Sequence, residues 1–277
     1  MSYLSTSLNI SDNNKPTKIT INTLNKYKVE QQKIAMLTCY DASFAKILNA
    51  CGVDVILIGD SLGNVIQGQS TTIPVTIEHM VYHTECVNRG NSRCFLLTDM
   101  PFATYNSPEI AYANASKLMQ AGAHMVKLEG GAWLAETINY LTIRGIPVCA
   151  HLGLTPQSVH VLGGFKKQAT NDADALILEK DALLLEQAGA SMVLFEAIPS
   201  ELAHKVTYQL SVPTIGIGAG KNCDGQVLVL NDVLGIFTGK APSFSKNYLS
   251  KDSNNLTIEG AIIKYVEEVK NGEFPAS

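Results

Sequence analysis

One unit recurs along the chain and constrains the fold more than any other feature. Leu118–Glu129, LMQAGAHMVKLE, matches Leu185–Glu196, LEQAGASMVLFE, and Leu48–Asp60, LNACGVDVILIGD, is a looser copy whose acid comes one residue later. Each copy reads as a helix end, a glycine that can cap it, a buried strand and an acid at the far end of the strand. Because helices between such strands are typical of parallel crossovers, the sequence predicts an α/β protein.

Seven short apolar runs have the nearly continuous aliphatic character of parallel strands that are covered on both faces. They are Ile34–Cys39, Asp54–Gly59, Cys94–Asp99, His124–Glu129, Ile146–His151, Ser191–Glu196 and Pro213–Gly218, and an eighth is expected at Val233–Thr238. Eight units predict a single-domain (β/α)8 TIM barrel, which suits 277 residues. An open doubly wound sheet gives the same local pattern and is the alternative.

Helical patterns fall between the expected strands, at Ser43–Ala50, Ile77–Asn88, Ser107–Gln120, Trp133–Arg144, Ala175–Gln187 and Glu201–Leu210. Residues 1–17 are expected to form a flexible N-terminal tail, and residues 18–277 the barrel domain. A last amphipathic helix at Thr257–Asn271 would cover the barrel or a partner subunit. The long polar segment after Asp60 has the length of a functional loop.

Composition excludes several classes of function. A net charge of −4 without a basic stripe argues against nucleic acid as a partner, and no apolar run is long enough to span a membrane. The six cysteines form no CxxC pair and several lie in apolar runs, which indicates free thiols in a reducing compartment. The N-terminus lacks the apolar region of a signal peptide. A cytoplasmic location follows as the expectation.

Chemistry-bearing side chains gather at the predicted strand ends, where a barrel places its active site. They are Asp60 and Ser61 after the second strand, Asp99 after the third, Lys127 and Glu129 on the fourth, His151 on the fifth and Glu196 on the sixth. Each has an ordinary structural alternative, such as a helix cap, a solvated ion pair or a core histidine. Their coincidence at equivalent positions favours a functional site.

The acids of this rim suggest a hard cation. Asp60, Asp99 and Glu129 offer oxygen ligands without a cysteine or histidine cluster, which favours Mg²⁺. Such an ion can chelate a 2-oxoacid and stabilise an enolate. Lys127 can pair with the substrate carboxylate or with developing negative charge, and Glu196 can take the proton next to the carbonyl.

Four further motifs carry weaker signals. His79 and His83 in EHMVYH are four residues apart but lack the order of a zincin motif, so a surface helix is favoured. IGIGAG, at 215–220, is read as a tight turn rather than a phosphate cradle. HVLGGFKKQ, at 160–168, is a glycine-hinged basic loop that suits a lid or an anion contact. Nothing marks Cys223 as a nucleophile.

Five segments together resemble the ketopantoate hydroxymethyltransferase family of the pantothenate pathway. They are GDSLGNVIQGQSTTIPVT, TDMPFATY, AGAHMVKLEGG, HLGLTPQSV and PTIGIGAGKNCDGQVLV, and the resemblance runs from about Lys18 to the C-terminus. It implies a Mg²⁺-dependent (β/α)8 enzyme that transfers a hydroxymethyl group from 5,10-methylenetetrahydrofolate to 3-methyl-2-oxobutanoate and forms 2-dehydropantoate. It also implies a large homo-oligomer, commonly a homodecamer.

The resemblance assigns roles to the same rim residues. It implies metal binding by Asp60, Asp99 and Glu129, with Glu129 acting through water, and substrate binding by Asp60, Ser61, Asp99 and Lys127. It implies Glu196 as the proton acceptor, with Lys127 and His151 completing the catalytic set. The chain departs from the usual family pattern at Asn64, at Ala150 and at residues 167–170. There Ala169 and Thr170 replace a glycine and a basic residue, which is expected to affect folate binding more than the reaction.

Two rival interpretations remain at this stage. One is a Mg²⁺-dependent oxoacid enzyme of the phosphonopyruvate mutase or isocitrate lyase kind, although such lyases generally need a mobile cysteine-bearing loop and Cys223 lies in a different context. The other is a barrel kept as an oligomeric scaffold or metabolite sensor. A magnesium-dependent activity would exclude the latter.

Overall fold

The computed structural model describes residues 17–236, 241–250 and 256–276. Eight parallel strands in sequence order close into one barrel, which confirms the predicted (β/α)8 fold. The strands are β1 Ile34–Thr38, β2 Val55–Ile58, β3 Phe95–Asp99, β4 Met125–Glu129, β5 Val148–Gly153, β6 Met192–Glu196, β7 Thr214–Ile217 and β8 Gly225–Leu228. The barrel forms a single domain. The predicted tail at 1–17 lies, apart from Thr17, outside the described residues.

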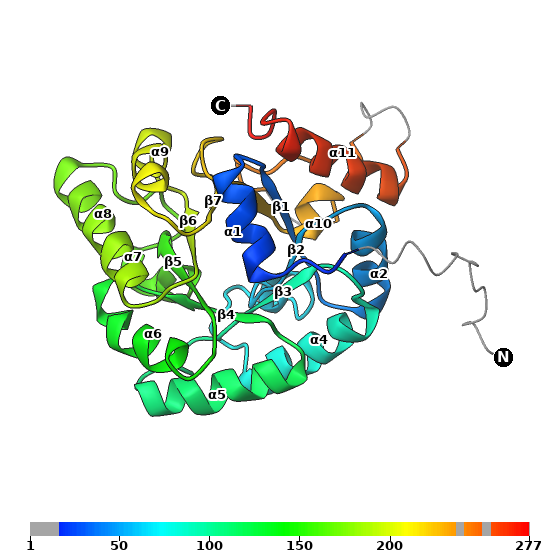
Figure 1. Cartoon of the computed structure of the whole chain (residues 1–277). Helices are drawn as coiled ribbons and strands as arrows, with labels where there is room; N and C mark the ends of the chain where they lie inside the picture. Colours follow the sequence, from blue (N-terminus) through cyan, green and yellow to red (C-terminus); the bar gives the residue numbers. More distant parts are fainter. Residues whose placement is uncertain (1–16, 237–240, 251–255, 277) are drawn as a thin grey trace.

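Helices surround the strands (Figure 1). They are α1 Ile21–Val29, α2 Ala42–Ala50, α3 Leu62–Val65, α4 Ile77–Gly90, α5 Pro108–Ala121, α6 Ala135–Thr142, α7 Val159–Leu162, α8 Asp172–Gln187, α9 Ser200–Gln209, α10 Leu230–Val233 and α11 Ile258–Lys270. Short 3₁₀ turns, η1 Ala132–Leu134 and η2 Pro156–Ser158, precede α6 and α7. None of the helices in these ranges is long and apolar enough to cross a membrane.

The glycine of each repeated unit ends a helix as the sequence predicts. Gly52, Gly122 and Gly189 have φ angles of 83°, 115° and 110°. These left-handed conformations are strained for residues with a Cβ atom, and they turn the chain from the helix into the next strand.

The strand side chains divide the core into two layers because successive residues face opposite sides of a sheet. Met36, Leu57, Leu97 and Leu194 belong to the cluster that fills the barrel, where Leu24 of α1 joins them. Figure 1 shows α1 lying across one end of the barrel. Strand residues of the other parity pack against the surrounding helices.

The predicted position of the eighth strand, Val233–Thr238, is wrong. The strand is Gly225–Leu228, and Val233 belongs to α10, while residues 237–240 lie outside the described residues. The connection from β7 to β8 contains no helix, unlike the usual parallel crossover. Two apolar runs follow β7. The prediction placed the strand in the second run, at Val233–Thr238, whereas the first run forms it.

The C-terminal helix packs on the barrel. The buried hydroxyl of Tyr265 in α11 donates hydrogen bonds to the backbone oxygens of Met36 at 2.9 Å and Gln226 at 3.0 Å. These residues lie on β1 and β8, so that α11 covers the seam where the first and last strands meet. The predicted helix is thus present and covers its own barrel.

Candidate active site

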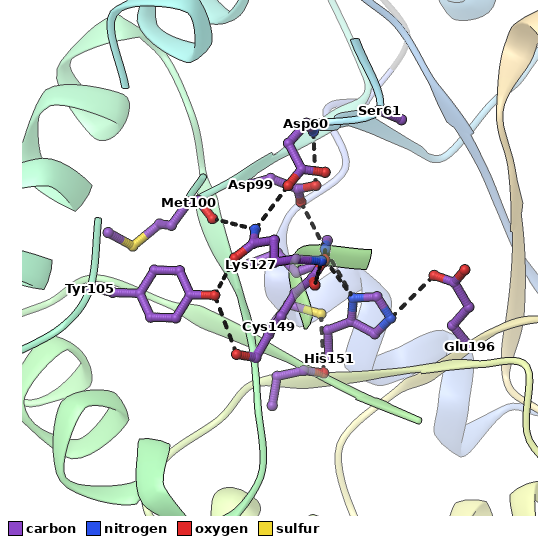
Figure 2. A network of polar contacts seen from close by, with 12 residues as sticks. Asp60, Ser61, Asp99, Met100, Tyr105, Lys127, Cys149, His151 and Glu196 are labelled. Carbon is purple, nitrogen blue, oxygen red and sulfur yellow. Dashed lines mark hydrogen bonds and ion pairs between the residues drawn. The ribbon is translucent and has the colours of Figure 1, made fainter. Parts of the chain in front are cut away.

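The predicted rim residues gather at one end of the barrel because their strands place them in register. Asp99 pairs with Lys127 in neighbouring strands, and Glu129 pairs with His151. Each shares a strand face with residues that fill the barrel, so that the polar side chains form the last layer of its interior. Figure 2 shows Asp60, Asp99, Lys127, His151 and Glu196 converging from their separate strands.

Lys127 is the buried cation of the cluster. Its Nζ atom lies 3.2 Å from Oδ1 of Asp99, 3.3 Å from Oε1 of Glu129 and 3.1 Å from Nδ1 of His151. Burial lowers the pKa of Lys127, but Asp99, Glu129 and Asp60 outweigh burial and hold the pKa well above its usual range. The ammonium group therefore stays charged inside the protein.

His151 lies between two carboxylates. Its Nδ1 atom is 3.2 Å from Oε1 of Glu129, and its Nε2 atom is 3.3 Å from Oε2 of Glu196. Burial and Lys127 lower the pKa of His151, but contacts with the two glutamates raise it overall. Burial raises the pKa of Glu129, yet Lys127 and His151 bring it down to about 2. The geometry thus favours an ionised Glu129 and directs the Nε2 atom of the imidazole toward Glu196.

Gln157 and Tyr105 complete the site, and the sequence reasoning assigned neither of them a role. The amide nitrogen of Gln157 donates to Oδ2 of Asp60 at 2.8 Å and to the backbone oxygen of Met100 at 2.9 Å. The hydroxyl of Tyr105 donates to the amide oxygen of Gln157. The backbone N–H of Gln157 donates to Oε2 of Glu129 at 3.0 Å. The segments TPQSV and TDMPFATY contain both residues, but contacts across the barrel leave no local pattern.

Asp60 and Asp99 form a buried acidic pair in which the pKa values of both carboxyl groups are raised. The backbone N–H of Asp60 donates to Oδ2 of Asp99 at 3.1 Å, while Oδ1 of Asp99 faces the Lys127 ammonium group at 3.2 Å. Burial and the charges of Asp99 and Glu129 raise the pKa of Asp60 well above its ordinary value. Burial also raises the pKa of Asp99, although Lys127 opposes it. Two adjacent buried carboxylates of this kind are suited to share a cation.

The donor set of Asp60, Asp99 and Glu129 consists of the carboxylate oxygens that Mg²⁺ prefers. Among the described residues, no group of three or more histidine, cysteine, aspartate or glutamate side chains is arranged to hold one ion. Oε1 of Glu129 contacts both Lys127 and His151, and its Oε2 accepts from the Gln157 backbone. Each oxygen of Asp99 has a single contact, and Asp60 is contacted at Oδ2, so these two acids keep more capacity for a cation. Because Mg²⁺ usually retains several waters, two carboxylates suffice.

Ser61 lies at the border between the acids and the cavity. It lines the cavity above the acids, and its hydroxyl lies 2.8 Å from the hydroxyl of Tyr40. Asn64, Val65 and Thr72 of the following polar segment line the same cavity, which has a volume of about 1200 Å³. The segment that the sequence marked as a functional loop therefore borders the site.

The weaker motifs fall outside the chemistry or at its edge. His79 caps its own helix through the backbone N–H of Thr76, and His83 contacts the backbone oxygen of Tyr40, so the two form no metal pair. Burial raises the pKa of the Cys223 thiol to about 12, so the thiol stays protonated and is a poor nucleophile. Gly218 has a φ angle of 62°, as a tight turn requires. Phe165 and Lys167 of the basic loop line the cavity.

Solved structures share the fold. The chain resembles phosphonopyruvate hydrolase in complex with oxalate and Mg²⁺, with a TM-score of 0.59, 10% identity and coverage of 76% of this chain and 80% of the other. It also resembles 2,3-dimethylmalate lyase of the PEP mutase/isocitrate lyase superfamily, with a TM-score of 0.57, 14% identity and coverage of 77% and 81%. At such low identities the likeness concerns the barrel alone.

Sequence relatives are far closer. The 3-methyl-2-oxobutanoate hydroxymethyltransferase of Cupriavidus pinatubonensis is 58% identical over 259 residues, which cover 94% of each chain. The enzyme of the same name from Nitrosospira multiformis is 57% identical and covers 93% of this chain and 97% of its own. The sequence profile described as ketopantoate hydroxymethyltransferase matches residues 18–277. The chain is a transferase and belongs to the ketopantoate hydroxymethyltransferase family.

Proposed function

We propose that the chain transfers a hydroxymethyl group from 5,10-methylenetetrahydrofolate to 3-methyl-2-oxobutanoate and forms 2-dehydropantoate. The name shared by its curated relatives supports this acceptor and a one-carbon donor. The observation that carries the proposal is the layer of four carboxylates, one lysine and one histidine at the strand ends. The acids of this layer outnumber its basic side chains, which suits a bound cation.

Mg²⁺ fits this layer, with Asp60 and Asp99 as direct ligands and Glu129 acting through water. The fit rests on the surplus of acids over basic side chains and on Asp60, whose Oδ2 accepts from Gln157 while the carboxylate pairs with neither cationic group. When bound, the ion would polarise the 2-oxo group and lower the energy needed to remove the neighbouring C3 proton. The backbone N–H or the hydroxyl of Ser61 would bind the carboxylate of the acid.

The proton is taken by Glu196. This residue borders the cavity and is the least buried acid of the cluster, so its carboxylate can reach a bound substrate. His151 holds Glu196 in place through the 3.3 Å contact. Lys127 provides a fixed positive charge for the developing enolate. The enolate carbon then attacks the methylene carbon of the donor, and water supplies the hydroxyl oxygen. Both C–N bonds of the methylene bridge break, and the proton held by Glu196 and one proton of water pass to the two nitrogens as tetrahydrofolate leaves.

Exchange of the C3 proton tests this assignment. In D₂O, with Mg²⁺ and without folate, the NMR signal of the C3 proton of 3-methyl-2-oxobutanoate should disappear with wild-type protein and persist with EDTA. Glu196→Gln should slow the exchange by at least about 100-fold, because general base catalysis contributes on this order. Glu201→Gln, an exposed change at the start of α9, is the control and should exchange like wild type. Near-wild-type exchange in Glu196→Gln would show that another group takes the proton.

Two further assignments stay predictions. A homodecamer is expected from the family resemblance, and the mass of the particle in solution by light scattering would test it. A cytoplasmic site of action is expected from the free cysteines, and fractionation of cells would test it. Among the described residues, all six cysteines are unpaired.

A further inference from the structure

The cavity is larger than the oxoacid requires. Its volume of about 1200 Å³ exceeds the roughly 300–1,000 Å³ of pockets that hold drug-sized ligands. The acids of the rim occupy one side, at the ends of β2 to β6. The other side lies at β7 and β8 and is lined largely by apolar or glycine residues, namely Ile217, Gly218, Val227, Val229 and Phe244. This second side offers space and an apolar surface for a flat ring.

Asp232 is the exception on this apolar side. It lies in α10, directly after β8, lines the cavity and is only 9% exposed. The N–H of Leu230 donates to Oγ1 of Thr38 at 3.0 Å, and the N–H of Tyr248 donates to the backbone oxygen of Val233 at 2.8 Å. The short helix that carries Asp232 is therefore fixed to β1 on one side and to Tyr248 on the other.

The other charged groups that line the cavity are either paired or exposed. The rim residues contact one another, Lys246 pairs with Glu268, and Lys167 and Glu273 are exposed. Over residues 17–236, 241–250 and 256–276, Asp232 is the one buried charged residue of the cavity wall whose side chain forms no hydrogen bond or ion pair. Burial alone raises its pKa, to about 6. A carboxylate that no protein group satisfies, on a wall that opens to the cavity, is placed to accept hydrogen bonds from a ligand.

We propose that Asp232 binds the ring of the one-carbon donor by accepting hydrogen bonds from two adjacent N–H groups at the edge of a planar heterocycle. The 2-amino-4-oxopyrimidine edge of 5,10-methylenetetrahydrofolate has this pattern of donors. The two oxygens of a carboxylate match paired N–H donors, as they do in bidentate contacts with arginine. The inference rests on the proposed function, since it names the residue that recognises the donor of that reaction.

Binding of tetrahydrofolate, measured by calorimetry with Mg²⁺ present, tests the inference. Asp232→Asn should raise the Kd at least tenfold, because its NH₂ group would face the donor edge of the ring. Asp232→Ser, a second variant, should do the same. Glu273→Gln removes the same charge from an exposed position on the cavity wall and should leave the Kd unchanged. A tetrahydropterin without the 2-amino group should bind wild type and Asp232→Asn with similar affinity.

Proton exchange distinguishes ligand recognition from a structural role. Asp232→Asn should keep wild-type exchange of the C3 proton and an undiminished Tm, because it removes a carboxylate that lacks a partner. Wild-type affinity for tetrahydrofolate in Asp232→Asn overturns the inference, and so does a parallel loss of proton exchange. If wild-type protein binds no tetrahydrofolate, the proposed donor fails together with this inference. If wild-type protein forms product and Asp232→Asn leaves the Kd for tetrahydrofolate unchanged, the inference about Asp232 is overturned while the proposed function stands.

Discussion

Gln157 holds two of the acids in position from a buried site. Because its amide nitrogen faces two acceptors, Oδ2 of Asp60 and the backbone oxygen of Met100, the orientation of the amide is fixed. Tyr105 secures the amide oxygen, and the backbone N–H holds Glu129. Asp60 thus accepts at Oδ2 and keeps its second oxygen for a cation. Gln157 is a positioning residue, since it acts through Asp60 and Glu129.

Replacing Gln157 with leucine should weaken metal binding. Leucine has a similar size but donates nothing to Asp60, so the carboxylate loses its fixed orientation. Loss of such a supporting contact typically lowers metal affinity by about 10–100-fold, which calorimetric titration of Mg²⁺ or Mn²⁺ into metal-free protein would measure. Tyr105→Phe should have a smaller effect in the same direction. Gln69→Leu, an exposed change, is the control. Unchanged affinity in Gln157→Leu would mean that Asp60 needs no support.

At the scale of elements, the segment between α7 and α8 has a strained residue. Ala169 is buried and has a φ angle of 53°, in the left-handed region that favours glycine. The N–H of the preceding Gln168 donates to the backbone oxygen of Ala197 at 2.8 Å, which holds the segment against the end of β6. Alanine in place of the family's glycine at position 169 therefore strains the backbone, in addition to its expected effect on folate binding.

Ala169→Gly should stabilise the protein. A left-handed conformation costs a residue with a Cβ atom about 1–2 kcal/mol, and the greater freedom of glycine in the unfolded chain offsets part of the gain. The free energy of unfolding in urea should rise by about 0.5–1 kcal/mol. Ala175→Gly, inside α8, is the matched control and should lower it by about 1 kcal/mol. A loss of stability in both variants would show that Ala169 is not strained.

Elements with a strong local signal could be predicted from the sequence. Six of strands β1 to β7 fall within the expected ranges, and β5 starts within its range but extends two residues beyond His151, to Gly153. Helix α5 begins directly after Ser107, whose side chain caps it, in the expected range. Helix α1 and strand β8 could not be placed in this way. The polar sequence of α1 buries only Leu24, so its hydrophobic pattern is weak. At β8, two apolar runs follow each other, and only the pairing with β1 and β7 selects the first.

At the scale of the whole molecule, barrel closure decides which charged groups meet. The sequence predicted that the acids share one end of the barrel, because that depends only on strand direction. It could not predict that Lys127 and His151 both contact the carboxylate of Glu129, or that the amide of Gln157 donates to Asp60. Those contacts depend on side-chain packing between distant segments. The division between Glu129, which pairs with both cationic groups, and Asp60 and Asp99, which keep more capacity for a cation, is therefore a property of the folded barrel.

This division predicts how Mg²⁺ changes the stability of the whole fold. A ligand that binds only the folded state stabilises it by about 2.7 kcal/mol at 100 times its Kd, so the Tm of wild type should rise with Mg²⁺ and fall again with EDTA. Asp60→Asn should abolish this rise, because one of the two direct ligands loses its charge.

Without metal, the same variant should be at least as stable as wild type, since burial and the charge of Asp99 disfavour an ionised Asp60. The substitution therefore has opposite effects with and without the ion, which a general loss of folding would not produce. Thermal unfolding of both proteins in EDTA and in excess Mg²⁺ gives the four values required. An equal rise of the Tm in Asp60→Asn would place the ion elsewhere, whereas lower stability in EDTA would mean that Asp60 supports the fold by itself.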